Sequence, residues 1–181
     1  METVTNPPTS ADQGSVAGED AWKTLGVVIE WIKHAETKAG ATLAAAGVLG
    51  GLIYTLAQAR TDHGAIFIVA AAVCGICVLV ATAAAGVALW PRRGVEQVST
   101  NLLYYGHVAD RFPADPTPYT TAFRELVRDR DSLESTIVQQ IWANSRVARD
   151  KYRWVNVAIL ALLCGVFSLA VTAVVSLFDG R

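Results

Sequence analysis

Three arginines recur at helical spacing in the longest polar region of the chain, and their side chains are well suited to binding a ligand. Arg146, Arg149 and Arg153 fall on one face of a helix, and guanidinium groups match the oxygens of a phosphate. Rings that can stack on a nucleotide base occur in the same region, at Tyr104, Tyr105 and Tyr119. These residues are candidates for binding a small anion. The same arginines would also suit anionic lipid headgroups, or would only orient a basic face toward the cytoplasm.

Other side chains with catalytic or metal-binding chemistry are scattered. Cys74, Cys77 and Cys164 all lie in apolar runs, so the CxxC spacing of the first two indicates packing rather than a metal or redox site. The three histidines are isolated from one another, and no Walker loop or GxSxG motif occurs. Ser168 and Ser176, in the last apolar run, are expected to hydrogen-bond back along their own helix. We predict no catalytic residue, no metal site, no cofactor and no enzymatic activity.

Three long stretches without charged side chains dominate the chain. They cover residues 39–59, 64–91 and 154–178, and each is longer than the roughly 20 apolar residues that cross a bilayer core. Together with 52% hydrophobic and only 17% charged residues, they exclude a soluble globular enzyme. We predict an all-α integral membrane protein with three transmembrane helices, at residues 39–59, 64–90 and 155–178. Because no carboxylate, lysine, arginine or histidine lies inside these helices, a coupled transporter is disfavoured.

The segments that flank the first two predicted spans indicate where helices begin and end. Residues 1–21 are rich in Thr, Ser, Pro, Gly and Ala, which predicts a disordered cytosolic tail rather than a signal peptide. Residues 22–38 have apolar side chains at steps of three and four, which predicts an amphipathic helix. No proline separates this helix from the first span. A four-residue turn at 60–63 makes the second span an antiparallel neighbour. Trp90, Pro91 and the arginines at 92 and 93 end that span.

Residues 91–154 form the only large polar region, and they predict a helical cytosolic module. Residues 95–108 have the pattern of an amphipathic helix, and three prolines within residues 112–118 indicate an extended loop. A short helix is expected around 119–129. A second helix should begin near Ser132 and continue without interruption into the third span, since no glycine or proline occurs before Gly165.

The distribution of basic residues predicts the orientation in the membrane. The segment before the first span contains three lysines, and residues 91–154 contain ten arginines and lysines. The opposite side holds only Arg60 and Arg181. The positive-inside rule therefore places the N-terminus and residues 91–154 in the cytoplasm, and the C-terminus on the opposite side of the membrane. A net charge of −1 argues against nucleic acid as a partner.

Small residues within the spans indicate faces for close helix packing. Gly47 and Gly51 form a GxxxG pair, which lets two helix backbones approach closely. A second small face occurs at residues 83–86. We expect these faces to support a homo-oligomer in the lipid bilayer.

Two stretches resemble the Pycsar effector membrane-protein family. The first, WIKHAETKA at residues 31–39, leads directly into a span of small residues, and it has Glu36 where members of the family usually have Asp. The second, QIWANSRVARDKY at residues 140–152, resembles the helix before the family's last span, and residues 102–109 resemble the helix after span two. The likeness covers roughly residues 22–178. The residues of this chain that carry the motif are Trp31, Glu36, Lys38, Ala39, Ser145, Lys151 and Tyr152.

The resemblance implies a function that composition alone does not reveal. Pycsar effectors act beside a cyclase that makes cyclic UMP or cyclic CMP during phage infection, and the membrane-type effector then impairs the membrane and causes abortive infection. For this chain it implies a cyclic pyrimidine nucleotide as ligand and a location in the bacterial inner membrane. Our own hypothesis is that residues 91–154 bind the nucleotide. The binding would change how the cytosolic helices pack and drive spans one and three into a leaking oligomer. The alternatives are a ligand-independent membrane scaffold or interaction subunit, and a small channel.

Overall fold

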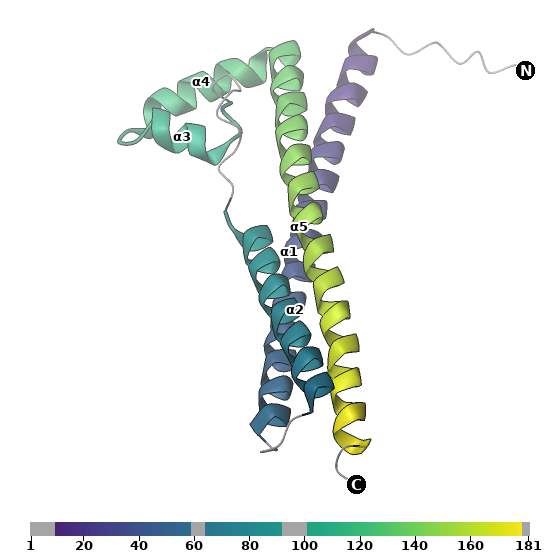
Figure 1. The fold of residues 1–181 in the computed structure, drawn as a ribbon. Helices are drawn as coiled ribbons and strands as arrows, with labels where there is room; N and C mark the ends of the chain where they lie inside the picture. The colour runs from purple at the N-terminus through teal and green to yellow at the C-terminus, as the bar shows by residue number, and fades with distance from the viewer. Residues whose placement is uncertain (1–9, 59–63, 92–100, 179–181) are drawn as a thin grey trace, which may run out of the picture. The chain divides into compact units, whose positions relative to one another are not determined.

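Five helices make up the computed structural model, which describes residues 10–58, 64–91 and 101–178; for residues 10–17, 177 and 178 it describes the backbone alone. In chain order they are α1 (Ser10–Gln58), α2 (Ala65–Leu89), α3 (Tyr105–Arg111), α4 (Pro116–Arg128) and α5 (Arg130–Phe178) (Figure 1). The described part of the chain contains no strand. The predicted all-α fold class is therefore confirmed.

Three of these helices, α1, α2 and α5, are long and apolar enough to cross a membrane. The 25 residues of α2 extend about 37 Å at a rise of about 1.5 Å per residue, slightly more than the ~30 Å hydrocarbon core. The other two contain 49 residues each and extend about 74 Å, so a membrane would cover only part of them. The expectation that the polar segments before spans one and three continue as helix into those spans is confirmed.

Residues 10–21 differ from the disordered tail that the sequence predicts, because α1 already begins at Ser10. No proline follows Pro8 in this segment, so the backbone hydrogen bonds of a helix are not interrupted. Glu19 also pairs with Lys23 one turn later, at 2.8 Å between oxygen and nitrogen. Residues 1–9 and the expected turn at 60–63 lie outside the described residues.

Two predicted boundaries between the second and third spans are wrong. The described part of the predicted helix 95–108 has a turn at residues 101–104, and helix α3 starts only at Tyr105. The expected extended loop 112–118 ends at Asp115, since Pro116 opens α4. Proline fits the first turn of a helix, where its missing N–H is not needed. The Asp115 side chain caps this helix by accepting a hydrogen bond from the Thr117 N–H at 2.8 Å.

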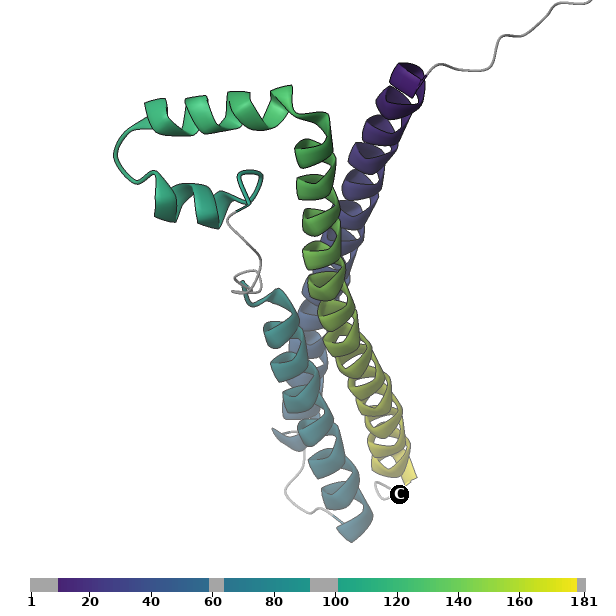
Figure 2. The ribbon, with the colours of Figure 1, turned by 90° about the horizontal axis from the view of Figure 1, so that it is seen from above.

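The chain divides into two units, each built from parts of more than one helix. One contains residues 1–31 and 92–147, and we call it the module unit. The other contains residues 32–91 and 148–181, and we call it the bundle unit. The bundle unit holds α2 together with the C-terminal parts of α1 and α5, which lie alongside it in both views (Figures 1 and 2).

Small buried residues form the seams along which the bundle unit packs. On α1 the buried positions recur at alternating steps of three and four, at Ala35, Ala39, Thr42, Ala46 and Leu49. On α5 the same alternation gives Ala148, Lys151, Val155 and Ala158. The buried residues of α2 include Ala81, Ala84, Ala85 and Ala88. A repeat of three and four is that of a left-handed coiled coil, and alanine at these positions allows close approach of the helix axes.

Asn101 organises the module unit just before α3. This side chain is only 3% exposed, and its amide Nδ2 donates to the Thr136 carbonyl of α5 at 3.1 Å. Its Oδ1 accepts from the Leu103 N–H at 2.8 Å, while its own N–H donates to Nδ1 of His107 at 3.0 Å. Asn101 thus joins the turn at 101–104 to both α3 and α5.

Aromatic rings connect α3 to α4 in the same unit. The ring of Tyr119 lies 5.6 Å from that of Phe112 and 5.7 Å from that of Phe123, measured between centroids. The Tyr119 hydroxyl donates to the Leu102 carbonyl at 3.4 Å. These contacts give the short helices a common apolar side.

Candidate functional site

Lys151 of α5 is the one charged residue on the alanine seams of the bundle unit that are named above. Its residue exposure is 3% and that of its side chain 4%. The neighbouring seam positions on the same helix are Ala148 and Val155, one turn before and after. A buried ammonium group is costly unless it is paired and hydrogen-bonded, so its partners decide whether this arrangement is stable.

The ammonium of Lys151 reaches both other helices of the bundle unit. Nζ donates to Oε1 of Glu36 on α1 at 2.9 Å and to the carbonyl oxygen of Ala88 on α2 at 2.8 Å. Ala88 carries one of the last four carbonyls of α2, which ends at Leu89, and such carbonyls have no partner within their helix. The C-terminal end of a helix also favours a nearby cation. One side chain therefore links α1, α2 and α5.

The environment of this ion pair is asymmetric. Lys151 is buried, whereas the side chain of Glu36 is 45% exposed. Removing one partner of a buried pair leaves an uncompensated charge and costs about 3–5 kcal/mol. The half-exposed carboxylate lowers that cost when Lys151 is the residue replaced, because Glu36 can turn into water.

Apolar residues surround the pair and bring further motif residues into contact. Ala35, Ala39, Ala88 and Val155 form a buried cluster, against which Tyr152 packs. The ammonium of Lys38 lies 5.6 Å from the centre of the Tyr152 ring, within the range of a cation–π contact. Five residues of the predicted family motif thus meet at one level of the bundle unit, namely Glu36, Lys38, Ala39, Lys151 and Tyr152.

The other two motif residues lie in the module unit. Trp31 is 52% exposed, and the hydroxyl of Ser145 donates to the carbonyl of Ile141 along its own helix at 2.8 Å. The convergence of Glu36 with Lys151 was not predicted, although both residues belong to the motif. The sequence held one signal for this contact. Lys151 stands at a step of three or four from Ala148 and Val155, in a row that is otherwise apolar.

The candidate ligand-binding arginines are all exposed, and they are divided between the two units. In the module unit the guanidinium of Arg146 lies 5.0 Å from the centre of the Trp142 ring, which is itself 51% exposed. In the bundle unit Nε of Arg149 lies 3.9 Å from Oδ1 of Asp150. An exposed pair of this kind contributes little to stability. The role of these arginines in binding stays a prediction.

Tyr104 and Tyr105 belong to an aromatic cluster at the start of α3. Their ring centroids lie 4.9 Å apart, and the Tyr104 ring also lies 5.0 Å from that of His107 in an edge-to-face arrangement. The Tyr105 ring is accessible, with the residue 72% exposed. A Cβ at Gly106 would come 2.6 Å from the Tyr104 ring, so a larger residue there would have to displace this ring.

The face of Gly47 and Gly51 is open in the described part of the chain. A Cβ built on either glycine would meet no atom within 4 Å. In the last predicted span, Gly165 is closely packed, since a Cβ there would lie 2.9 Å from Cδ2 of Leu49 and 3.3 Å from Cβ of Cys77. Gly165 therefore allows the close approach of α5 to α1 and α2.

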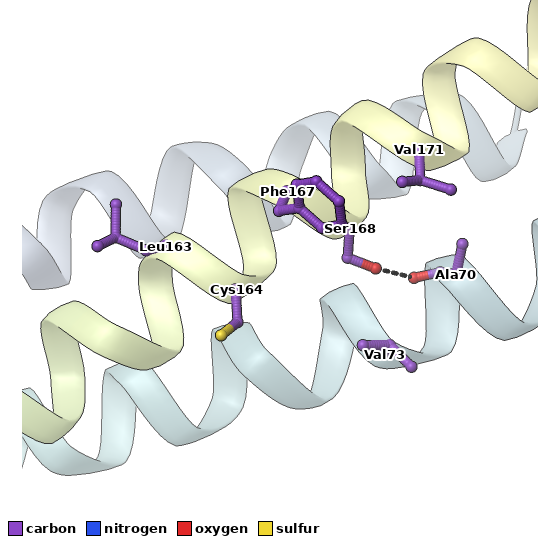
Figure 3. Close-up of a pocket in the computed structure, with 7 residues that line it drawn as sticks. All are labelled: Ala70, Val73, Leu163, Cys164, Phe167, Ser168 and Val171. Atoms are coloured by element: carbon purple, nitrogen blue, oxygen red, sulfur yellow. Dashed lines mark hydrogen bonds between the residues drawn. The ribbon is translucent and has the colours of Figure 1, made fainter.

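An apolar groove of about 480 Å³ lies between α2 and α5. Figure 3 shows its lining residues, which are Ala70, Val73, Leu163, Cys164, Phe167, Ser168 and Val171. The expectation that Ser168 bonds back along its own helix is wrong, because its hydroxyl donates to the carbonyl of Ala70 on α2 at 2.7 Å (Figure 3). The buried Cys74 thiol also contacts the Gly165 carbonyl at 3.4 Å, as expected of a cysteine that packs between helices.

Comparison with known proteins assigns the chain to a family. The model of the Pycsar effector protein domain, PycTM, matches residues 20–178. The Pycsar effector protein PtPycTM of Propioniciclava tarda is 34% identical over 157 residues, which cover 86% of this chain and 78% of that protein. The Pycsar effector protein MePycTM of Micromonospora echinofusca is 48% identical over 40 residues, covering 22% of this chain and 68% of that protein. No solved structure gives a significant match. The chain belongs to the PycTM family of Pycsar effector proteins.

Proposed function

We propose that this protein is an effector of antiphage defence that senses cyclic UMP or cyclic CMP and then impairs the inner membrane. The resulting loss of membrane integrity would kill the infected cell, which is abortive infection. The partners in this proposal are a cyclic pyrimidine nucleotide made by a neighbouring cyclase, the lipid bilayer and further copies of the same chain.

The family match over residues 20–178 carries the proposal. It covers the three helices that are able to cross a membrane and also the module between the second and the third. A protein with most of its apolar helix surface exposed, as on Val48, Leu79, Leu160 and Phe167, suits a lipid environment. An effector built in this way acts on the membrane without any catalytic group.

Exposed side chains between the second and third spans support a small anionic ligand. Exposed guanidinium groups at Arg146, Arg149 and Arg153 are suited to a phosphodiester, and the exposed Tyr105 ring is suited to stacking on a pyrimidine. We propose these residues and Tyr104 as ligand-binding candidates. We also propose a cytoplasmic N-terminus and a cytoplasmic region 91–154, with the C-terminus outside, on the distribution of lysine and arginine.

A dye-release experiment tests the proposed function. The full chain is reconstituted in vesicles of phosphatidylethanolamine and phosphatidylglycerol loaded with a self-quenching dye. Cyclic UMP and cyclic CMP are compared with cyclic AMP and with linear UMP. The proposal expects release with one or both cyclic pyrimidine nucleotides, and none with the two control nucleotides.

Substitutions then test the candidate site. Replacing Arg146, Arg149 and Arg153 together by alanine should abolish the response. The matched control replaces Arg124 and Arg128, which are equally exposed residues of α4, and it should respond as the original chain does. Absence of both nucleotide binding and dye release would instead favour a ligand-independent scaffold.

A further inference from the structure

We propose that the ion pair between Glu36 and Lys151 is a latch that keeps the three helices of the bundle unit closed, and that its release permits leakage. This inference rests on the proposed function, because it assigns the regulation of the same membrane-impairing activity. It concerns a contact wholly within the bundle unit, formed by α1, α2 and α5.

The first argument is the position of Lys151 on the seam. Coiled-coil seams gain stability from apolar side chains, and a lysine at such a position lowers stability while it fixes which residues face each other. The neighbouring seam residues of α5 are Ala148 and Val155. A charged group among them lowers the stability of the closed arrangement, so these helices separate more easily than they would along a wholly apolar seam.

The second argument is that one nitrogen atom makes both contacts of the latch. Nζ of Lys151 contacts Glu36 at 2.9 Å and the Ala88 carbonyl at 2.8 Å. Moving this one ammonium therefore removes a link from α1 and from α2 together. The contact of Lys38 with the Tyr152 ring lies beside it in sequence on both helices, so a rotation of α5 against α1 disturbs both contacts.

The third argument concerns what must follow when the pair breaks. An ammonium that loses its carboxylate is unstable in an apolar setting, so Lys151 must reach water. It is 3% exposed in the closed arrangement, and separation or rotation of the helices would hydrate it. Breaking the latch would then admit water between the helices, and a ligand would drive it by binding the opened arrangement more tightly.

The exposure of Glu36 indicates where release begins. Its side chain is 45% exposed and that of Lys151 only 4%. Water and dissolved ions can compete for the carboxylate but cannot reach the ammonium directly. Neutralising Glu36 should therefore weaken the latch from its exposed side.

The test uses the full chain in the dye-loaded vesicles described above, without nucleotide. Glu36→Gln should raise the resting rate of release about tenfold, within the range of typical coupling between two states, because the buried ammonium of Lys151 is left without its carboxylate. The matched control is Glu19→Gln, which removes the exposed pair of Glu19 with Lys23 and should leave resting release unchanged. Resting release that stays at the original rate in Glu36→Gln would overturn the latch.

A reversible lock keeps the inference testable if Glu36→Gln does not insert. Ala39→Cys on α1 and Val155→Cys on α5 place thiols in the same buried cluster, in a chain whose three native cysteines are replaced by alanine. Disulfide formation should suppress nucleotide-driven release, and reduction should restore it. A locked chain that releases dye as fast as the reduced chain contradicts the latch.

The same measurements separate this inference from the proposed function. If the original chain does not respond to any nucleotide but Glu36→Gln leaks at rest, the proposed ligand is wrong and the latch is supported. If nucleotides trigger release in the original chain and in the locked chain alike, the proposed function holds and the latch fails.

Discussion

The hydroxyl of Ser168 on α5 donates a 2.7 Å hydrogen bond to the backbone carbonyl of Ala70 on α2, and both groups are buried. Within α5, the hydroxyl of Thr172 donates to the backbone carbonyl of Ser168 at 2.9 Å. Polar contacts between membrane helices contribute where hydrophobic driving force is small. Ser168 is thus a direct link between two predicted spans.

Replacing Ser168 by alanine should therefore loosen the packing of α2 on α5. The expected loss is about 0.6 kcal/mol of unfolding free energy, the average for such bonds in membrane proteins. Unfolding in mixed micelles with increasing denaturing detergent measures it. The control is Thr55→Ala, since the exposed Thr55 hydroxyl only donates back to the Gly51 carbonyl; equal losses from both variants would contradict a special role for Ser168.

Substitution of Asn101 should disrupt the module unit. Asn101→Ala removes the bonds to the Thr136 carbonyl and the Leu103 N–H, and a buried polar group left unpaired costs about 1–3 kcal/mol. Faster backbone hydrogen exchange in residues 101–111 is the expected result. Thr121→Ala, which removes only an exposed bond to the Thr117 carbonyl, should leave the exchange rates unchanged, and protection that survives Asn101→Ala would refute this assignment.

Substitutions of Gly165 and of Gly47 should change the stability of the protein in opposite directions. Gly165→Val should destabilise the bundle unit by about 1–3 kcal/mol, as overpacking does, because a Cβ there already lies within 2.9 Å of Leu49. Gly47→Ala meets open space and should raise the stability of the isolated chain, since alanine favours helix by up to about 1 kcal/mol. Thermal unfolding in detergent compares the two. A loss of stability in Gly47→Ala only under conditions where the chain oligomerises would identify residues 47–51 as a contact between copies.

The start of α4 should be sensitive to acid. The hydrogen bond from the Thr117 N–H holds the pKa of Asp115 below its usual value, so the capping interaction is present above that usual value and is lost as the pH falls through the lowered one. Helix content near α4, followed by NMR chemical shifts of residues 116–120, should decline on acidification. Asp115→Asn keeps a capping side chain but cannot titrate, so a decline of equal size in this variant would show that the cap is not responsible.

Some features of this fold could be predicted from the sequence because they depend on local properties of the chain. The three spans follow from uncharged stretches, and the continuity of α1 and α5 follows from the absence of proline. The boundaries near Tyr105 and Pro116 were missed because residues 101–104 are held as a turn by contacts of Asn101, and because a proline can begin a helix as well as interrupt one.

The candidate site could not be predicted in the same way. Glu36 and Lys151 are 115 positions apart, and one sequence carries no information about which distant residues pair. The rotation of each helix decides whether the Ser168 hydroxyl faces its own backbone or that of α2, and whether Gly47 or Gly165 lies at an interface. Periodicity is hidden in these spans, since almost every position is apolar whichever way it faces.

The alanine seams of the bundle unit have a consequence for its energetics. Alanine side chains remove little apolar surface from their surroundings, and lipid tails solvate an apolar helix about as well as another helix does. The packing of the three helices in the bundle unit is therefore expected to be only marginally stable, held mainly by close backbone contact and by a few polar bonds. Little free energy would then be needed to separate these helices.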